Sequence, residues 1–378
     1  MMEFAGRTGL SPAKEVPRRY LWTDAFAVCN FLDLFRQTGE EEYRDLALRL
    51  VDQVHHVLGR HREDDPREGR LSGLDEEEGK WHPTKGGLRI GKSMNERKPG
   101  NPYDENLEWD RDGQYFHYLT KWMHALDRVT RVTGDPIYHT WAIELAKTAH
   151  ARFTYIPRGG GQRRMYWKMS IDLAYPLVPS MGHQDPLDGF ITFNVLQATA
   201  AKDTERLTGL DLHAEIAAMA DICKGKTWAT DDSLGIGGLL SDAYKVAQLI
   251  VNENFERADL LQILLDSSQP GLESFARKNS WKVPADYRLA FRELGLSIGL
   301  RAVERLQGLI EENPGFFNKK LPLHSRIASL MRHTPLSEII ESFWLDGSNQ
   351  KAESWTAHQD INMVMLATSL APDGYLAL

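Results

Sequence analysis

Three segments of the chain repeat one plan, in which an apolar helical run, a Thr-Gly turn and a second helical run follow one another. The turns are Thr38-Gly39, Thr133-Gly134 and Thr208-Gly209. A glycine just past a helix end supplies the left-handed residue that terminates the helix, so each segment predicts a pair of antiparallel helices. Helical hairpins repeated along the chain predict an all-α protein.

The two helices of each predicted hairpin distribute their apolar residues differently. The second helix carries one apolar stripe, as at Leu46, Leu50 and Val54, and it therefore buries only one side. The first helix is apolar nearly all round, as over residues 25–35, and must be covered on several sides. Alternating enclosed and one-sided helices predict an inner ring of helices inside an outer ring, a closed (α/α)6 toroid.

We expect one toroid domain over residues 20–378, preceded by an N-terminal extension over residues 1–19. Two long irregular stretches interrupt its hairpins. Residues 59–111 are rich in charge, Gly and Pro and are too long for an idle connector, so we expect them to overhang the mouth of the ring. Residues 154–187 hold Gly159-Gly160-Gly161 between apolar runs, which predicts a small β-hairpin at the same mouth.

The charge and cysteine content narrow the classes of partner. The chain has 45 Lys and Arg against 53 Asp and Glu, a formal net charge of -8, which is the wrong sign for binding nucleic acid or anionic lipid. It shows neither a membrane-spanning run nor a secretory signal, so we expect a cytoplasmic protein with no membrane partner. Cys29 and Cys223 lie in separate apolar runs, which disfavours a disulfide or a thiolate zinc site. We expect neither a metal nor a cofactor.

Aromatic and acidic residues recur at the entries to the predicted inner helices. A Trp stands two to five residues ahead of an Asp at five entries, and His183 and Asp185 mark the remaining one; the five are Trp22 and Asp24, Trp109 and Asp112, Trp228 and Asp231, Trp281 and Asp286, and Trp355 and Asp360. A single Asp in such a place is often only a helix cap. In a toroid, however, the inner helix entries converge on one funnel, so the whole set would line one pocket.

This pattern resembles the six-hairpin glycosidase-like superfamily, whose (α/α)6 toroids include glycoside hydrolases, unsaturated-uronide hydrolases, polysaccharide lyases and the N-acylglucosamine 2-epimerase group. The resemblance covers the chain from about Tyr20 to the C-terminus and implies an enzyme that acts on carbohydrate. Only five outer helices are readable for six inner ones. Either residues 1–19 supply part of the missing cover, or the ring is incomplete.

Glycoside hydrolysis needs one protonated carboxyl group and one carboxylate, roughly 5 to 9.5 Å apart. We predict that Asp112 and Asp185 are this catalytic pair. Asp112 lies in the densest block of aromatic and charged residues, where Arg111 would hold a carboxylate ionised. Asp185 belongs to a His-Gln-Asp triplet that recurs at residues 358–360. The leading prediction is a glycoside hydrolase.

The other residues of the helix entries are predicted to bind the substrate, because aromatic rings suit the apolar faces of sugars and polar side chains orient hydroxyl groups. They are Trp22, Asp24, Trp109, Asp110, Tyr115, His117, His183, Asp188, Tyr287, Trp355, His358 and Asp360. The expected partner is a small carbohydrate or glycoside. Basic residues in the two overhanging stretches add the alternative of an acidic sugar such as a uronate.

Two further alternatives come from other function classes. A sugar isomerase or epimerase would use histidines as its acid-base pair, and His117, His183 and His358 are the candidates. A non-catalytic carbohydrate-binding protein would keep the aromatic platform without two carboxyl groups at working distance. A polysaccharide lyase is an alternative within the enzyme class. The sequence does not determine the oligomeric state.

Overall fold

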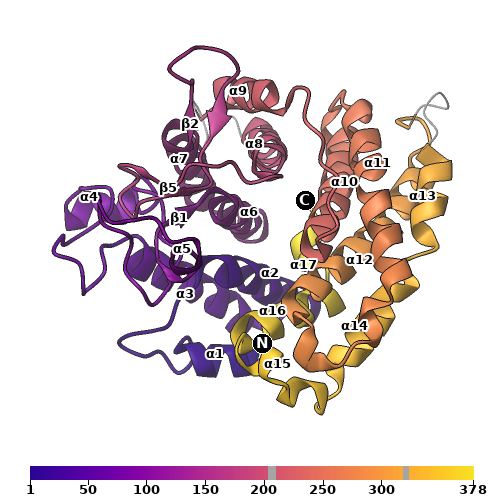
Figure 1. The fold of residues 1–378 in the computed structure, drawn as a ribbon, viewed down its shortest axis with the longest axis horizontal. Coiled ribbons are helices and arrows are strands. Elements are labelled where there is room, and N and C mark those ends of the chain that lie inside the picture. The colour runs from indigo at the N-terminus through magenta and orange to yellow at the C-terminus, as the bar shows by residue number, and fades with distance from the viewer. Residues whose placement is uncertain (203–209, 318–322) are drawn as a thin grey trace. The chain divides into compact units, whose positions relative to one another are not determined.

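The protein is all-α with small antiparallel sheets, as the ribbon of the computed structural model shows (Figure 1). The chain divides into two compact units, one over residues 2–225 and the other over residues 226–378 together with Met1. That residues 20–378 form a single domain stays a prediction. The structure describes residues 1–202, 210–317 and 323–378.

Helical hairpins build the unit over residues 2–225. α2 packs on α3, α6 on α7 and α8 on α9, so the predicted pairs are confirmed. Gly39 and Gly134 each adopt a φ of 74° at the ends of α2 and α6, as a Thr-Gly helix stop requires. The third predicted turn, Thr208-Gly209, lies outside the described residues. The helices are α1 (Met2–Thr8), α2 (Leu21–Thr38), α3 (Glu41–Leu58), α4 (Glu76–Trp81), α5 (Glu105–Asp110), α6 (Phe116–Thr133), α7 (Pro136–Phe153), α8 (Asp185–Lys202) and α9 (His213–Cys223).

The first and second helices of a hairpin differ in burial as their sequences predict. In α2, every residue from Leu21 to Asp33 is buried. In α3, burial follows one stripe that includes Leu46, Leu50 and Val54. An enclosed helix packs against neighbouring elements on all sides, whereas a one-sided helix leaves its polar face exposed to water. The hairpins therefore present enclosed helices covered by one-sided ones.

Short strands hold the second irregular stretch, residues 154–187, on this unit. β1 (Gln114–Tyr115), β4 (Lys168–Met169) and β5 (Pro176–Val178) form an antiparallel sheet in the order β1-β4-β5. β2 (Thr154–Tyr155) and β3 (Arg164–Met165) pair antiparallel across the glycines, so the predicted β-hairpin is confirmed. Because β1 leads directly into α6, the pairing of β1 with β4 holds the second stretch beside the start of α6.

The N-terminal extension is ordered and packs on α3. Phe4 and Ala5 of α1 are buried. The Arg49 and Gln53 side chains of α3 donate hydrogen bonds to the carbonyl oxygens of Leu10 and Gly9. Residues 1–19 thus give additional cover to an outer helix.

In the unit over residues 226–378, α10 packs on α11 and α12, and α12 also contacts α14 and α16. Glycines allow α10 and α12 to approach closely, because a Cβ atom at Gly237 would lie 2.0 Å from the carbonyl oxygen of Gly295. The elements are α10 (Ser233–Glu253), α11 (Ala258–Lys278), η1 (Ser280–Lys282), η2 (Ala285–Tyr287), α12 (Ala290–Glu312), α13 (Leu323–Met331), α14 (Pro335–Leu345), η3 (Asn349–Lys351), α15 (Glu353–Thr356), α16 (Gln359–Leu370) and α17 (Asp373–Leu376).

Within the described residues, α10 alone is long and apolar enough to cross a membrane by length and composition. Its most apolar window has a mean hydropathy of 1.2, and 72% of that window is buried inside the protein. A buried core helix shows the same combination of length, composition and burial.

Candidate active site

Five aromatic side chains in residues 2–225 form a connected group, which we call the aromatic cluster. Its members are Trp22, Tyr118, Tyr115, Trp167 and Trp109, and consecutive ring centroids in this order lie 6.5, 5.3, 6.1 and 5.0 Å apart. Trp22 and Tyr115 are buried, whereas Trp109 is 44% exposed. The aromatic cluster therefore runs from the core of the unit to its surface.

His117 lies beside the aromatic cluster, and Asp185 faces it from another helix. The His117 ring stands 5.2 Å from Tyr115 and 4.9 Å from Tyr118, measured between centroids. Its Nδ1 atom is 3.5 Å from Oδ1 of Asp185. The Asp185 side chain is 8% exposed and that of His117 is 30% exposed, so the imidazole is the more accessible partner.

The polar atoms of this pair are incompletely bonded. Among the described residues, neither Nδ1 of His117 nor Oδ2 of Asp185 has a hydrogen-bond partner, although both atoms are buried. A buried polar atom without a partner costs free energy and is uncommon in native proteins. The pair therefore keeps unused hydrogen-bonding capacity beside a half-exposed imidazole.

Local structure explains how the chain places these two side chains. His117 is the second residue of α6, immediately after β1. Asp185 is the first residue of α8, where Pro186 fits the first helical turn. The loop ahead of α8 closes tightly over the carboxylate, because a Cβ atom at Gly182 would lie 2.5 Å from Oδ1 of Asp185.

Asp112 has quite different surroundings. It does not open a helix, since α6 begins at Phe116 and Gly113 has a φ of 149°, a conformation that suits glycine and not a helix. Its side chain is fully buried, and Oδ2 accepts from Arg89 Nη1 at 2.9 Å. Oδ1 accepts the backbone N–H groups of Gly91 and Gly113, each at 3.0 Å. The catalytic role of Asp112 stays a prediction, but this geometry favours a structural role.

Two other acids predicted to bind substrate, Asp24 and Asp188, also bond to groups of this unit. Asp24 accepts the backbone N–H of Tyr20 at 2.9 Å, at the start of α2. Asp188 accepts a hydrogen bond from Thr120 and lies 2.8 Å from Lys121 Nζ. Asp188 therefore ties α8 to α6.

The remaining predicted residues fall in different places. Asp110 and His183 are exposed within residues 2–225. In the other unit, Tyr287 is 83% exposed and Trp355 is 2% exposed, with the Trp355 ring stacked on Trp344. His358 is exposed and Asp360 is half-buried. That all the predicted residues line one funnel stays a prediction.

Four residues of the site region are not among the predicted catalytic and substrate-binding residues, namely Tyr20, Tyr118, Trp167 and Lys168. The Tyr20 and Tyr118 hydroxyl groups lie 2.7 Å apart, and burial raises the pKa of Tyr20. Lys168 is fully buried and donates to the carbonyl oxygens of Glu108 and Arg111 at 2.5 and 2.8 Å. Tyr20 and Tyr118 flank predicted residues and could be found by widening those motifs, whereas Lys168 is marked in the sequence only as one of the basic residues of the overhanging stretches.

Lys168 holds the exposed end of the aromatic cluster in place. Its two acceptor carbonyls flank Trp109 in the chain, and its Nζ lies 5.4 Å from the centroid of Tyr115. Burial lowers the pKa of Lys168 to about 8, with Glu108 acting in the opposite direction. The side chain thus joins β4 to the segment that carries Trp109.

No family model and no curated protein matches the chain. Among solved structures, it is similar to the cellobiose 2-epimerase from Spirochaeta thermophila DSM 6192, with a TM-score of 0.51, 13% sequence identity, and coverage of 94% of this chain and 86% of that one. It also matches the cellobiose 2-epimerase from Bacillus thermoamylovorans B4167, with a TM-score of 0.49, 11% identity, and 93% and 88% coverage. The first similarity confirms the predicted (α/α)6 fold class.

Proposed function

We propose that this chain is a carbohydrate-processing enzyme of the epimerase or isomerase type, which acts on a free sugar next to its carbonyl carbon. The observation that carries the proposal is the His117–Asp185 pair beside the aromatic cluster. The shared fold with a cellobiose 2-epimerase supports it. This function was an alternative from the sequence, and it now stands ahead of glycoside hydrolysis.

The proposed reaction needs a group that removes and returns a proton. Epimerisation at C2 of a free sugar takes the proton from C2, forms an enediolate with the C1 carbonyl, and returns a proton to the other face. The imidazole of a histidine can both accept and donate a proton and suits this step. We assign the removal of the C2 proton to His117, and the Asp185 carboxylate next to its Nδ1 would stabilise the imidazolium that forms. This imidazolium would release its proton to water, and a water molecule would supply the proton that returns to the other face.

The surroundings of the acids favour this chemistry over hydrolysis. A glycosidase needs two carboxyl groups on the two sides of the scissile bond. Asp112 is bonded on both oxygens to the surrounding loop and to Arg89, and Asp188 is bonded to Thr120 and Lys121. Asp185 keeps a buried oxygen without a partner among the described residues, so one carboxylate and one imidazole form the better-supported pair.

We propose a neutral sugar as the substrate. Cations in the irregular stretches would recognise an acidic sugar only if they were available to it. Arg89 is paired with Asp112 at 2.9 Å and Arg97 with Glu108 at 2.6 Å, and the side chain of Lys168 is fully buried against backbone carbonyls. The aromatic cluster would then bind the apolar face of the sugar ring.

The test is exchange of the C2 hydrogen with solvent. Cellobiose and a panel of other free sugars are incubated in D₂O with the protein, and deuterium at C2 is followed by NMR; aryl glycosides are assayed in parallel for release of the aglycone. We expect C2 exchange with at least one sugar, and a loss of about 10²- to 10⁴-fold in His117→Gln.

A matched control is His213→Gln, because His213 is an exposed histidine at the start of α9. It should exchange like the unmodified protein. Aglycone release without any C2 exchange would contradict the epimerase assignment and restore the hydrolase. Equal exchange in His117→Gln and His213→Gln would show that His117 does not carry the proton.

A further inference from the structure

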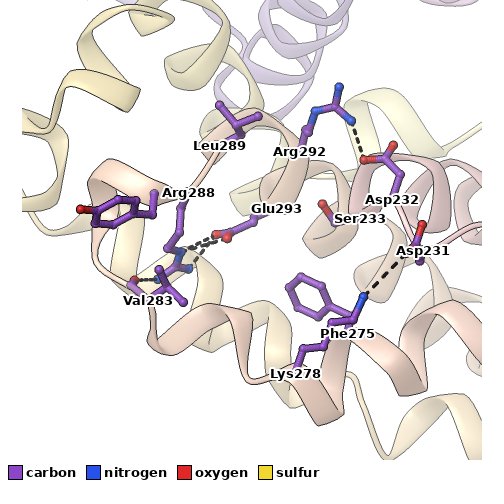
Figure 2. Close-up of a pocket in the computed structure, with 11 residues that line it drawn as sticks. Asp231, Asp232, Ser233, Phe275, Lys278, Val283, Arg288, Leu289, Arg292 and Glu293 are labelled. Atoms are coloured by element: carbon purple, nitrogen blue, oxygen red, sulfur yellow. Dashed lines mark hydrogen bonds and ion pairs between the residues drawn. The ribbon is translucent and has the colours of Figure 1, made fainter.

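A pocket of about 370 Å³ lies within residues 226–378. Figure 2 shows it between the start of α10, the end of α11 and the connection from α11 to α12. Its volume falls in the range of small-molecule sites. No residue of the aromatic cluster, nor His117 or Asp185, belongs to it.

The floor of the pocket is formed by a buried ion pair, Arg288 and Glu293. Arg288 is buried and donates to both oxygens of Glu293, at 2.9 and 2.6 Å. Its guanidinium also lies 3.7 Å from the ring centroid of Phe343, and Trp344 Nε1 donates to Glu293 at 2.9 Å. A buried ion pair with these additional bonds holds its geometry and offers no free charge to a ligand.

The rim of the pocket carries two further ion pairs, which are exposed. Arg292 Nη1 lies 2.6 Å from Asp232, with side chains 44% and 38% exposed. Lys278 lies 3.7 Å from Asp231, with side chains 59% and 80% exposed. Exposed pairs are held weakly, so these groups can turn toward a ligand.

The charges of the pocket cancel. Each of its three cations faces a carboxylate, as Figure 2 shows for the dashed contacts. A net anion would meet the acids at the start of α10, and a net cation would meet the guanidinium and ammonium groups. The pocket therefore favours a neutral ligand that offers many hydrogen-bonding groups.

Three exposed apolar side chains, Tyr287, Leu289 and Val283, also line the pocket. Tyr287 is 83% exposed, Leu289 is 42% exposed and Val283 is 38% exposed, and all three line the pocket. Apolar groups gathered at a pocket mark a surface that a ligand covers. A flat ring next to paired charges matches a sugar, which has apolar C–H faces and hydroxyl groups around its edge.

We propose that this pocket is a second carbohydrate site, which binds a neutral sugar ring. Tyr287 would contact the apolar face of the ring, and the Arg292–Asp232 pair would bond its hydroxyl groups. The site lies in the other compact unit from His117 and Asp185. It rests on the proposed function for its substrate class, and the experiment below measures its occupancy without any turnover.

The experiment uses the full chain labelled with 3-fluorotyrosine, with the ¹⁹F signal of Tyr287 assigned from Tyr287→Phe. Cellobiose and glucose are titrated as neutral probes, and glucose 6-phosphate as the anionic probe. We expect the Tyr287 signal to move with the neutral sugars. Arg292→Met should weaken this titration about tenfold, because it removes the charge-assisted hydrogen bonds to hydroxyl groups.

The matched control is Arg305→Met. The Arg305–Asp373 pair has side chains 43% and 40% exposed, nearly the same as Arg292–Asp232, but it lies outside the pocket. Arg305→Met should leave the titration unchanged. A Tyr287 signal that no sugar moves, equal effects of the two variants, or tighter binding of glucose 6-phosphate than of glucose would each overturn the inference.

A third variant separates this inference from the proposed function. His117→Gln should lose C2 exchange and keep the Tyr287 titration. If no sugar undergoes exchange while the neutral sugars still move the Tyr287 signal, the proposed function fails and the second site stands. If exchange occurs and the signal never moves, the second site fails and the proposed function stands.

Discussion

The aromatic cluster with its acid-base pair and the pocket of residues 226–378 both combine rings with charges, but they treat their carboxylates differently. Asp185 keeps a buried oxygen without a partner among the described residues. In the pocket, Asp231, Asp232 and Glu293 each face a cation. An incompletely bonded carboxylate beside an imidazole suits proton transfer, whereas balanced ion pairs suit the binding of a neutral ligand.

The same contrast separates the two carboxylates that the sequence predicts as partners. Asp112 is enclosed by Arg89 and two backbone amides, and Arg62 Nη1 lies 3.4 Å from it. Asp185 forms an ion pair with His117, at 3.5 Å. Fully bonded carboxylates hold structure together, so substitution of the two residues should affect different properties of the protein.

The largest effect should come from Asp185→Asn. Removal of the carboxylate charge leaves the His117 imidazolium without its counter-charge, and we expect the rate of C2 exchange to fall by about 10²-fold or more. The measurement is the initial rate of C2 exchange over a range of sugar concentrations.

Asp211→Asn serves as the control for that series, since Asp211 is an exposed acid outside both sites. Its kinetics should match those of the unmodified protein. Unchanged turnover in Asp185→Asn would remove the functional distinction between the two carboxylates.

The next largest effect should be a loss in the free energy of unfolding in Asp112→Asn. This change takes the negative charge from between Arg62 and Arg89 in a fully buried site, and breaking a buried ion pair in this way costs about 3 kcal/mol of the free energy of unfolding. Urea unfolding followed by tryptophan fluorescence gives the value. Asp185→Asn should lose less than about 1 kcal/mol, and an equal loss in both variants would contradict the comparison.

The sequence was sufficient to predict the hairpins and the alternation of helix burial. Both depend on local patterns, namely glycine at the helix ends and the spacing of apolar residues. Gly39 and the stripe at Leu46 and Leu50 behave as those patterns require. The predicted β-hairpin likewise followed from glycines between two short apolar runs.

The roles of the acids were harder to predict, because they depend on contacts made across the chain. Asp112 and Asp185 look alike in the sequence, and their difference arises from Arg89 and Gly91, which bond to Asp112 from 23 and 21 residues earlier in the chain. Tyr287 was predicted to bind substrate, but the paired charges that define its pocket come from α11 and α12 and from the segments just ahead of α10 and α12. Such pairings appear only once the helices are packed.

A smaller effect should distinguish the buried pair of the pocket floor from the exposed pair of its rim. Glu293→Gln weakens the contacts to Arg288 and to Trp344, all of them buried, and should cost about 2 kcal/mol in the free energy of unfolding. Asp232→Asn removes an exposed ion pair but keeps a residue that caps α10 well, so its cost should stay below about 1 kcal/mol. Urea unfolding of the two variants gives the order, and a larger loss in Asp232→Asn would refute the assignment of floor and rim.

The smallest effect is a pH dependence due to Lys168, which links the aromatic cluster to the fold. Burial lowers the pKa of Lys168 from 10.5 to about 8 in the folded protein, so the unfolded chain binds more protons between these two values. The free energy of unfolding should therefore rise with pH in this window, by about 1 kcal/mol between pH 8 and pH 9.

Lys168→Met has no ammonium group to titrate and should lack this contribution, while all other groups titrate equally in both proteins. Urea unfolding at pH 7, 8 and 9 gives the difference between the two slopes. Parallel pH profiles would mean that the ammonium group keeps its charge in the fold, held by Glu108 and by the two carbonyls that flank Trp109.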